Sequence, residues 1–158
     1  MKNLKRLAIL FLAVAGLFVM TGCMGQDKVE GELADLMNKL YESIPEDERP
    51  MMLMQTEVDS ETVEYFLGST EIEFDKALAS EPGVSSIAHS VVLVRAKENA
   101  DIEKIKTQIK ENINPRKWMC VGVEEKDVIV ENRGDLIILI MIEDEATREK
   151  IEEGFKNL

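Results

Sequence analysis

The side chains best suited to chemistry in this sequence are a histidine and a cysteine in its second half. His89 is the only histidine, and its imidazole could act as a general base. Cys120 follows Arg116 and Lys117, and nearby positive charge favours the reactive thiolate. If the fold brought Cys120 to His89, the pair could serve a thiol-dependent or other small hydrolase. Because nothing in the sequence places them together, we expect a core histidine and a buried, inert thiol.

The other cysteine, Cys23, ends a stretch that is typical of a bacterial lipoprotein signal. Three basic residues precede the apolar run Leu7–Met20, and Thr21-Gly22-Cys23 completes a lipobox. The run has 14 residues, fewer than the roughly 20 that cross a bilayer. We therefore expect residues 1–22 to be removed as a signal peptide and the Cys23 sulfur to carry a palmitate-type diacylglycerol. The alternative is a buried N-terminal helix.

Lipidation of Cys23 predicts where the protein resides and how its thiols behave. We expect a chain anchored by lipid to the outer, extracytoplasmic face of the cell membrane, in a Gram-positive envelope. Since the lipid occupies the Cys23 sulfur, Cys120 has no disulfide partner within the chain, although this compartment permits disulfides. Removal of 22 of the 158 residues leaves 136, a length that suits one domain stabilised by its core alone.

The mature chain is strongly acidic. The first 22 residues hold three of the 19 basic residues and no acidic one, which leaves 16 basic against 31 acidic residues and a formal charge of −15. Nucleic acid needs clustered Lys and Arg to neutralise its phosphates, so it is not an expected partner. Anionic headgroups should also repel this surface, which leaves the acyl chains on Cys23 as the membrane attachment.

Met51, Met52 and Met54 form a thioether cluster that could bind Cu(I), an ion that prefers soft sulfur ligands. No histidine or cysteine lies near them in the sequence. Methionine more often fills irregular gaps in a core. Further methionines on other predicted elements favour this core-filling interpretation: Met37, Met119 and Met141.

Two acidic clusters offer the hard oxygen ligands that Ca²⁺ prefers. Neither cluster has the spacing and glycine of a dedicated calcium loop, so we expect solvated helix caps there, and neither a metal site nor a cofactor. The clusters are Glu57 with Asp59 and Glu61, and Glu143-Asp144-Glu145.

Trp118, with Arg116 and Lys117 before it, is the one locally basic and aromatic spot on this acidic chain. Trp and Arg are enriched among the residues that anchor interfaces. These three residues are therefore the candidate contact surface for an envelope protein. The alternative is that Trp118 closes the core beyond the helix that precedes it.

Apolar spacing predicts the elements that would position these residues. A three-and-four repeat predicts a helix over 32–44, and an apolar stretch predicts a short strand over 51–58. A further helix over 60–67 can end at Gly68, which adopts a left-handed conformation readily.

The second half predicts a sheet covered by helices. A β-hairpin is expected over 72–97, and its second strand is apolar on both faces, as in the centre of a sheet. We predict a single α+β domain over 32–158, with a mainly antiparallel sheet and helices packed on one face, after a lipidated flexible tether at 23–31. Further predicted elements are strands at 119–123, 128–130 and 136–142, a turn at 131–134, and helices that begin after Asp101 and Asp144.

Three segments carry a resemblance to a known family. They are Ile87–Ala96, Asn114-Pro115-Arg116-Lys117-Trp118, and Gly134-Asp135 before the last predicted strand. On these segments the chain resembles a domain-of-unknown-function family of small Gram-positive (Firmicute-type) lipoproteins, from about Gly31 to the C-terminus. The resemblance implies one domain and an envelope location, and it supplies no catalytic residues.

The function class that fits these observations best is a non-enzymatic binding or accessory domain on the membrane. The sequence contains no glycine-rich phosphate loop, nucleophile elbow or zinc-protease pattern. Two alternatives stay open: thiol chemistry with Cys120 and His89, and handling of Cu(I) or Ca²⁺ by the methionines or carboxylates.

Overall fold

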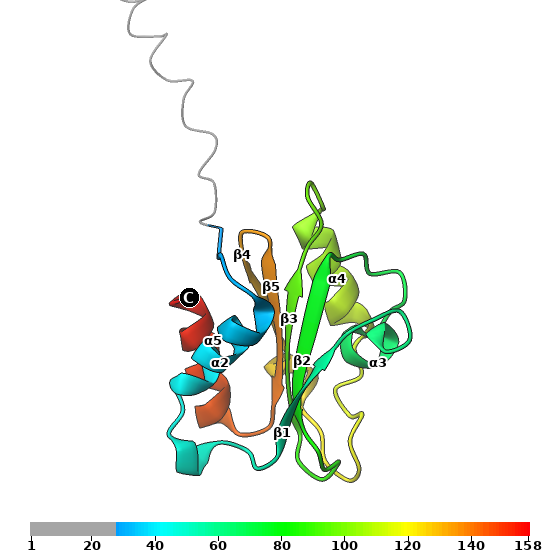
Figure 1. Cartoon of the computed structure of the whole chain (residues 1–158). Coiled ribbons are helices and arrows are strands. Elements are labelled where there is room, and N and C mark those ends of the chain that lie inside the picture. Colours follow the sequence, from blue (N-terminus) through cyan, green and yellow to red (C-terminus); the bar gives the residue numbers. More distant parts are fainter. Residues whose placement is uncertain (1–27) are drawn as a thin grey trace, which may run out of the picture.

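A five-stranded antiparallel sheet runs through the middle of the structure, a computed structural model that describes residues 28–158 (Figure 1). Its strands lie in the order β1-β2-β3-β5-β4. The predicted signal peptide and the lipidation site at Cys23 lie outside the described residues. The strands are β1 (Leu53–Glu57), β2 (Lys76–Pro82), β3 (His89–Arg95), β4 (Ile129–Arg133) and β5 (Leu136–Ile142).

The central strands β3 and β5 are buried on both of their faces. Six of the seven residues of β3 and all seven of β5 are buried, as the apolar run Val91–Val94 of β3 and the wholly apolar sequence of β5 predict. β3 pairs antiparallel with β5 on one side and with β2 on the other. A strand that is apolar on both faces needs cover on both, because either face would otherwise meet water.

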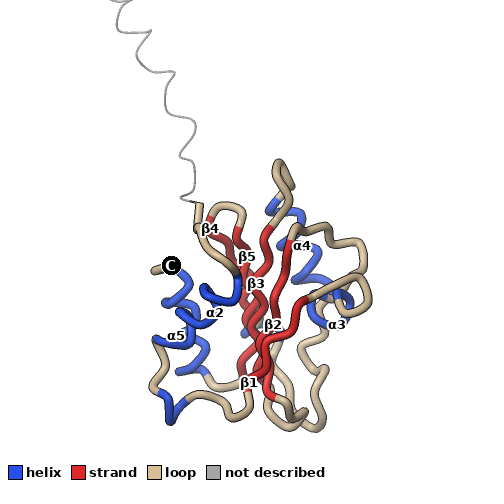
Figure 2. The backbone as a smooth tube through the Cα atoms, in the orientation of Figure 1, coloured by secondary structure: helices blue, strands red, loops and turns tan. Residues whose placement is uncertain are grey.

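Helices accordingly lie on both faces of the sheet, and the prediction that they pack on one face is wrong in this respect (Figure 2). One layer holds α2 (Leu33–Glu42) and α5 (Glu145–Lys156), and the other holds α3 (Val63–Leu67) and α4 (Ile102–Asn112). Along β5, Ile138 lies in the first layer and its neighbours Ile137 and Leu139 in the second, as strand alternation requires. The α+β class and the antiparallel sheet are confirmed.

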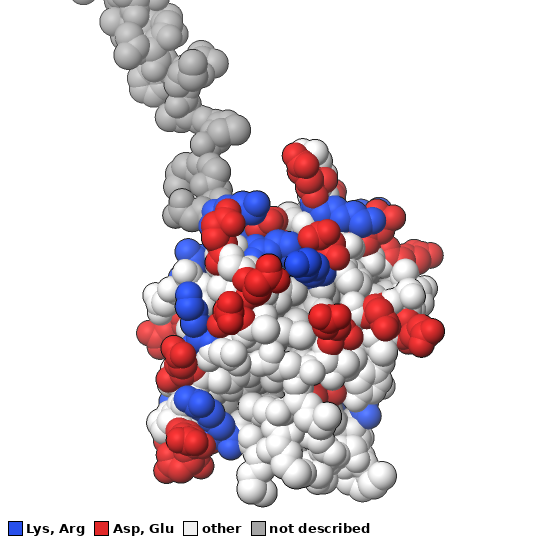
Figure 3. All heavy atoms as spheres, in the orientation of Figure 1, with Lys and Arg blue, Asp and Glu red and all other residues white. Residues whose placement is uncertain are grey.

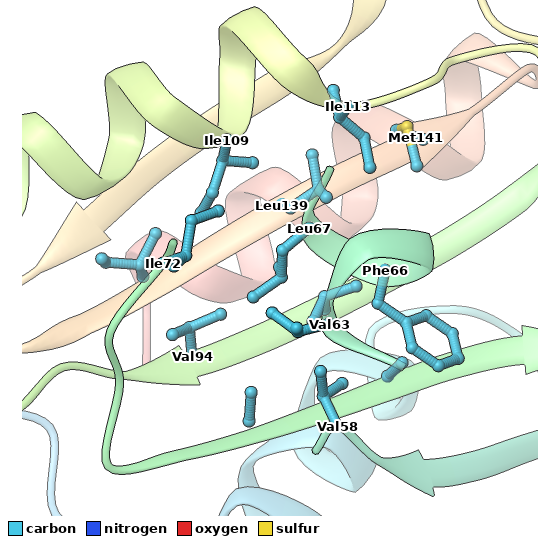
Figure 4. Close-up of a cluster of buried hydrophobic side chains, with 14 of the residues drawn as sticks. Val58, Val63, Phe66, Leu67, Ile72, Val94, Ile109, Ile113, Leu139 and Met141 are labelled. Carbon is cyan, nitrogen blue, oxygen red and sulfur yellow. The ribbon is translucent and has the colours of Figure 1, made fainter. Parts of the chain in front are cut away.

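The α3/α4 layer is shown in Figure 4, where side chains of both helices meet over the sheet. Leu67 of α3, Ile109 of α4 and Leu139 of β5 are fully buried there. Gly68 ends α3 with φ +90°, and a Cβ at this position would lie 2.4 Å from the backbone of Asn112. Only glycine fits where α3 passes the end of α4, which confirms the predicted left-handed helix end.

The caps of both long helices in the second half are confirmed. Asp101 Oδ1 accepts a hydrogen bond from the Lys104 backbone amide at 3.0 Å, and Asp144 Oδ2 accepts one from Thr147 at 2.8 Å. The turn between β4 and β5 lies later than predicted. Arg133 pairs with Leu136, so the turn is Gly134-Asp135, with φ +57° at Gly134.

The predicted strand at 119–123 is wrong, because this segment is a loop. Cys120 has φ +62°, a left-handed conformation that interrupts an extended chain. Val123 donates its backbone amide to the carbonyl of Pro115 at 2.8 Å, so the segment folds back on its own start. Apolar composition alone could not distinguish this loop from a strand.

The two ends of the sheet, the tether end and the methionine end, carry different segments. The tether end comprises residues 28–32, where the chain enters the domain, the loop 97–100 and the turn 134–135. The methionine end comprises residues 51–54, the β2–β3 loop at 83–88 and the loop 119–121. No helix within residues 28–158 is long and apolar enough to cross a membrane.

Candidate binding surface

Four methionine side chains are exposed at the methionine end. Their exposed fractions are 77% for Met51, 62% for Met52, 60% for Met54 and 68% for Met119. The core-filling interpretation is therefore wrong for these four, although Met37 and Met141 are fully buried and fit it. Exposed apolar side chains that gather in one place often mark an interaction site.

The β2–β3 loop holds the methionine-bearing segments together. The backbone amide of Gly83 donates to the Met52 carbonyl at 2.9 Å, and that of Met119 donates to the Ser85 carbonyl at 2.8 Å. The turn before β1 and the loop after α4, far apart in sequence, thus flank the same loop. This gathering could not be predicted from residue spacing.

Backbone strain accompanies the exposed methionines. Three residues other than glycine have positive φ within 28–158: Met52 at 57°, Asn99 at 61° and Cys120 at 62°. Asparagine tolerates this conformation, whereas methionine and cysteine adopt it at a cost. Two strained residues without that tolerance therefore lie at the methionine end, and strain of this kind is often found at functional sites.

A buried ion pair lies beneath this surface. Lys117 Nζ is 2.5 Å from Glu81 Oε1 on β2, and only 4% of the Lys117 side chain is exposed. Burial lowers the pKa of Lys117, and Glu81 opposes that shift. The ammonium also lies 4.2 Å from the ring centre of Tyr65, whose hydroxyl donates to Glu81 Oε2 at 3.2 Å. The pair fixes the loop that carries Met119 to β2 and leaves no net charge beneath it.

The three residues of the predicted contact surface, Arg116, Lys117 and Trp118, differ in how far they are buried. Trp118 is 8% exposed and packs in the α3/α4 layer, so its indole closes the core, the alternative that the sequence left open. Lys117 is buried in its ion pair, and only Arg116 is exposed. Directly after Trp118, Met119 and Cys120 are exposed as well.

His89 and Cys120 do not form a catalytic pair in this fold. His89 is 2% exposed, and its Nε2 lies 2.7 Å from the hydroxyl of Tyr41 on α2. Burial lowers the His89 pKa to about 4, so the imidazole is neutral at ordinary pH. Cys120 is exposed, on a loop whose Trp118 and Val123 belong to the opposite layer. The predicted buried thiol is wrong, and the core histidine is confirmed.

The acidic clusters act as local caps. Asp59 Oδ1 accepts hydrogen bonds from the Glu61 and Thr62 amides, each at 3.0 Å, and from the Thr62 hydroxyl at 2.8 Å. These bonds hold the Asp59 pKa below its usual value, as the bond to Thr147 does for Asp144. Within residues 28–158 no group of three or more His, Cys, Asp or Glu side chains could hold a metal ion.

The tether end is built from charge and hydrogen bonds. Arg95 donates to the Val29 carbonyl at 2.7 Å, to Asp135 Oδ1 at 3.1 Å and to the Gly31 carbonyl at 3.2 Å. Val29 is 6% exposed and packs in the α2/α5 layer, so the folded domain begins inside the segment predicted as tether. The predicted tether at 23–31 therefore overlaps the folded domain from Val29 onward. Sequence spacing marks Arg95 only as the last residue of an apolar strand and does not indicate these bonds.

Comparison with protein-family models, curated proteins and solved structures gave no match for this chain. The resemblance to a family of Gram-positive lipoproteins therefore stays a prediction.

Proposed function

We propose that this chain is a lipid-anchored, non-enzymatic binding domain of a Gram-positive cell envelope. Cys23 carries the anchor, and the methionine end binds an envelope protein. The observation that carries the proposal is the exposure of Met51, Met52, Met54 and Met119, at 60 to 77%, on a chain whose described surface is otherwise rich in charge.

The distribution of charge supports this choice of surface. Figure 3 shows Lys, Arg, Asp and Glu gathered around the tether end, whereas the lower centre of the same view is largely uncharged and a smaller charged group lies at its lower left. Charged side chains are depleted in the cores of interfaces, where methionine is enriched. Flexible, polarisable methionine side chains also adapt to the shape of a partner.

The position of the anchor supports it as well. Cys23 and Lys28 are five residues apart, a separation that spans at most about 18 Å. Such a short connection would hold the tether end near the bilayer. The methionine end lies at the other end of β1, β3 and β5 and would face away from the membrane, accessible to a partner.

Crosslinking and mass spectrometry on intact cells that express the native lipoprotein test the proposal. We expect one reproducible neighbour. It should be lost when Met51, Met52, Met54 and Met119 are changed together to serine. The matched control changes four exposed residues of the tether end and its surroundings to serine: Lys28, Glu30, Glu73 and Glu98. The control should keep the neighbour, and its loss in both variants, or in neither, would contradict the proposal.

The anchor has its own test. In cells fed a labelled palmitate analogue, the native chain should be labelled and should partition with membranes. A Cys23→Ala variant should lose both properties. Membrane attachment that persists in Cys23→Ala would overturn the lipobox interpretation while leaving the binding surface untouched.

Binding of Cu(I) is a second candidate, because the methionine end exposes Cys120 beside the thioethers. It predicts that Cu(I) raises the melting temperature of the native chain and not that of the serine variant, through binding linkage. An unchanged melting temperature at Cu(I) concentrations well above the protein would remove this candidate and leave the protein-binding proposal standing.

A further inference from the structure

Strand β1 forms an open edge of the sheet beside the methionine end. It pairs with β2 on one side, and within residues 28–158 it has no strand on the other. Met54 to Glu57 are all exposed, and only Leu53 is half-buried. The strand is therefore accessible along its edge and on both of its faces.

The outward backbone groups of β1 can be identified from its pairing. Val58 donates to Ala77 at 2.9 Å and Gly83 donates to Met52 at 2.9 Å, which fixes the phase of the ladder. Antiparallel strands bond through alternate residues. Met54 and Thr56 therefore bond to β2, whereas the amides and carbonyls of Leu53, Gln55 and Glu57 point away from it.

Three devices that commonly protect an edge, namely Lys, Pro and a bulge, are missing from β1, and Glu57 is its only charged residue. Natural edge strands carry Lys, Pro or a bulge, which prevent a further strand from pairing. The sequence of β1, Leu-Met-Gln-Thr-Glu, has neither Lys nor Pro, and its register with β2 is continuous. At the opposite edge, all five residues of β4 are half-buried, and Lys106 of α4 and Lys156 of α5 contact it.

The surroundings of β1 define the chemistry of a strand that would fit. Met54 and Tyr65, 60% and 48% exposed, lie at its start, so a partner needs apolar side chains there. Glu57, Asp59 and Glu61, all exposed, lie at and beyond its end, so a partner needs Lys or Arg there. An antiparallel partner, like every other pair in this sheet, would therefore begin with basic residues and continue with alternating apolar ones.

A second copy of this chain does not meet these requirements. Two antiparallel β1 strands would be related by a two-fold axis perpendicular to them, which reverses the direction from tether end to methionine end in one copy. Since β1 runs between the two ends, the two lipid anchors would then point in opposite directions (Figure 1). Copies anchored in one membrane by short tethers could not pair in this way.

We propose that β1 accepts an extended segment of the partner protein as a sixth strand, bonded to Leu53, Gln55 and Glu57 and seated beside Met54 and Tyr65. This inference rests on the proposed function and names the chemistry of its partner: a segment with Lys or Arg at its start, followed by alternating apolar residues. Backbone hydrogen bonds would give affinity. Contacts with the methionine end and with Glu57, Asp59 and Glu61 would fix the register of the added strand.

Hydrogen exchange measured by NMR on the full chain in detergent tests the strand addition. The probe is a synthetic peptide that begins Lys-Arg and continues with alternating Val and Thr. On saturation, exchange at the amides of Leu53, Gln55 and Glu57 should slow by about tenfold or more, whereas Met54 and Thr56 should already be protected without peptide. A peptide with N-methyl groups on the amides that would face β1 keeps the side chains, cannot donate those backbone bonds and should serve as the inactive control.

A matched pair of variants examines the same bonds from the side of the domain. Gln55→Pro removes one outward amide that β2 does not use, and edge strands tolerate proline at such a position. It should weaken peptide binding about tenfold or more, whereas Gln55→Ala, which loses the same side-chain bond to Asn38, should not.

Unchanged exchange at Leu53, Gln55 and Glu57 in the presence of saturating peptide would overturn the strand addition. Equal binding by Gln55→Pro and Gln55→Ala would do the same. If the serine variant at the methionine end lost its cellular neighbour while Gln55→Pro kept it, the proposed function would stand and this inference would fall. If both variants kept the cellular neighbour, the proposed function and this inference would both fall.

Discussion

The tether end and the methionine end of this domain are built on opposite principles. At the tether end, Arg95 bonds to two backbone carbonyls and to Asp135, and Lys76 pairs with Glu32. At the methionine end the ion pair of Lys117 and Glu81 lies beneath the surface, and the large apolar side chains that meet water are methionines. One end is therefore stabilised by contacts that the domain makes with itself, whereas the other leaves apolar side chains exposed for a partner to contact.

The largest expected effect on stability comes from the ion pair beneath the methionine end. Lys117→Met should lower the free energy of unfolding by about 3–5 kcal/mol, because it leaves the Glu81 carboxylate largely buried without its partner. Urea denaturation measures this loss. The double variant with Glu81→Gln should recover much of it, since no unpaired charge then remains. A loss below about 1 kcal/mol would mean that the pair is not a structural support of the methionine surface.

Acid should destabilise the α2/α5 layer through His89. The folded pKa of about 4 lies below the ordinary 6.5, so between these values the unfolded chain binds a proton that the folded chain does not. The stabilisation from the neutral imidazole is therefore complete above about pH 6.5 and is lost as the pH falls toward 4, by about 3 kcal/mol in total.

The control for this pH dependence is His89→Gln, which does not titrate. Denaturation of both chains between pH 7 and 4 isolates the histidine, because the carboxylates contribute to both curves. Parallel curves for the native chain and the variant would show that His89 is not the titrating group.

A smaller effect is expected at the tether end. Arg95→Met should cost about 2 kcal/mol, because it removes charge-assisted bonds to Val29 and Gly31. Amide exchange in residues 28–32 should quicken more than elsewhere. Asp135→Asn keeps both carbonyl bonds and should cost less. Equal losses of unfolding free energy in the two variants would show that Arg95 stabilises the domain through Asp135 and not through residues 28–32.

The smallest effect on stability is expected for the exposed methionines. Met54→Ser and Met119→Ser should each change the free energy of unfolding by less than about 0.5 kcal/mol, as surface substitutions usually do. A loss above about 2 kcal/mol for either one would mean that its side chain supports the fold, and the contrast between the two ends would fail.

The sequence predicted most of the fold because its signals are local. The apolar repeat of α2, the caps at Asp101 and Asp144 and the glycine at position 68 each act within a few residues. The two-sided apolar pattern of β3 also implied helices on both faces, and the prediction of one covered face overlooked that consequence.

The binding surface could not be predicted in the same way, because tertiary contacts assemble it. Met119 lies near Met52 only through hydrogen bonds of both segments to the β2–β3 loop. Lys117 and Glu81 are 36 positions apart, and no periodicity links them. A signal was present in Met51, Met52 and Met54, but composition does not distinguish a buried methionine from an exposed one.

Site-specific photocrosslinking can determine which of the two ends contacts the partner. A photoreactive phenylalanine analogue would replace either Met119 at the methionine end or Glu98 at the tether end, both of which are exposed. The cells would express the lipoprotein with this one substitution. We expect one protein adduct from position 119 and no adduct of that mass from position 98. The same adduct from both positions, or an adduct from position 98 alone, would contradict the proposed function.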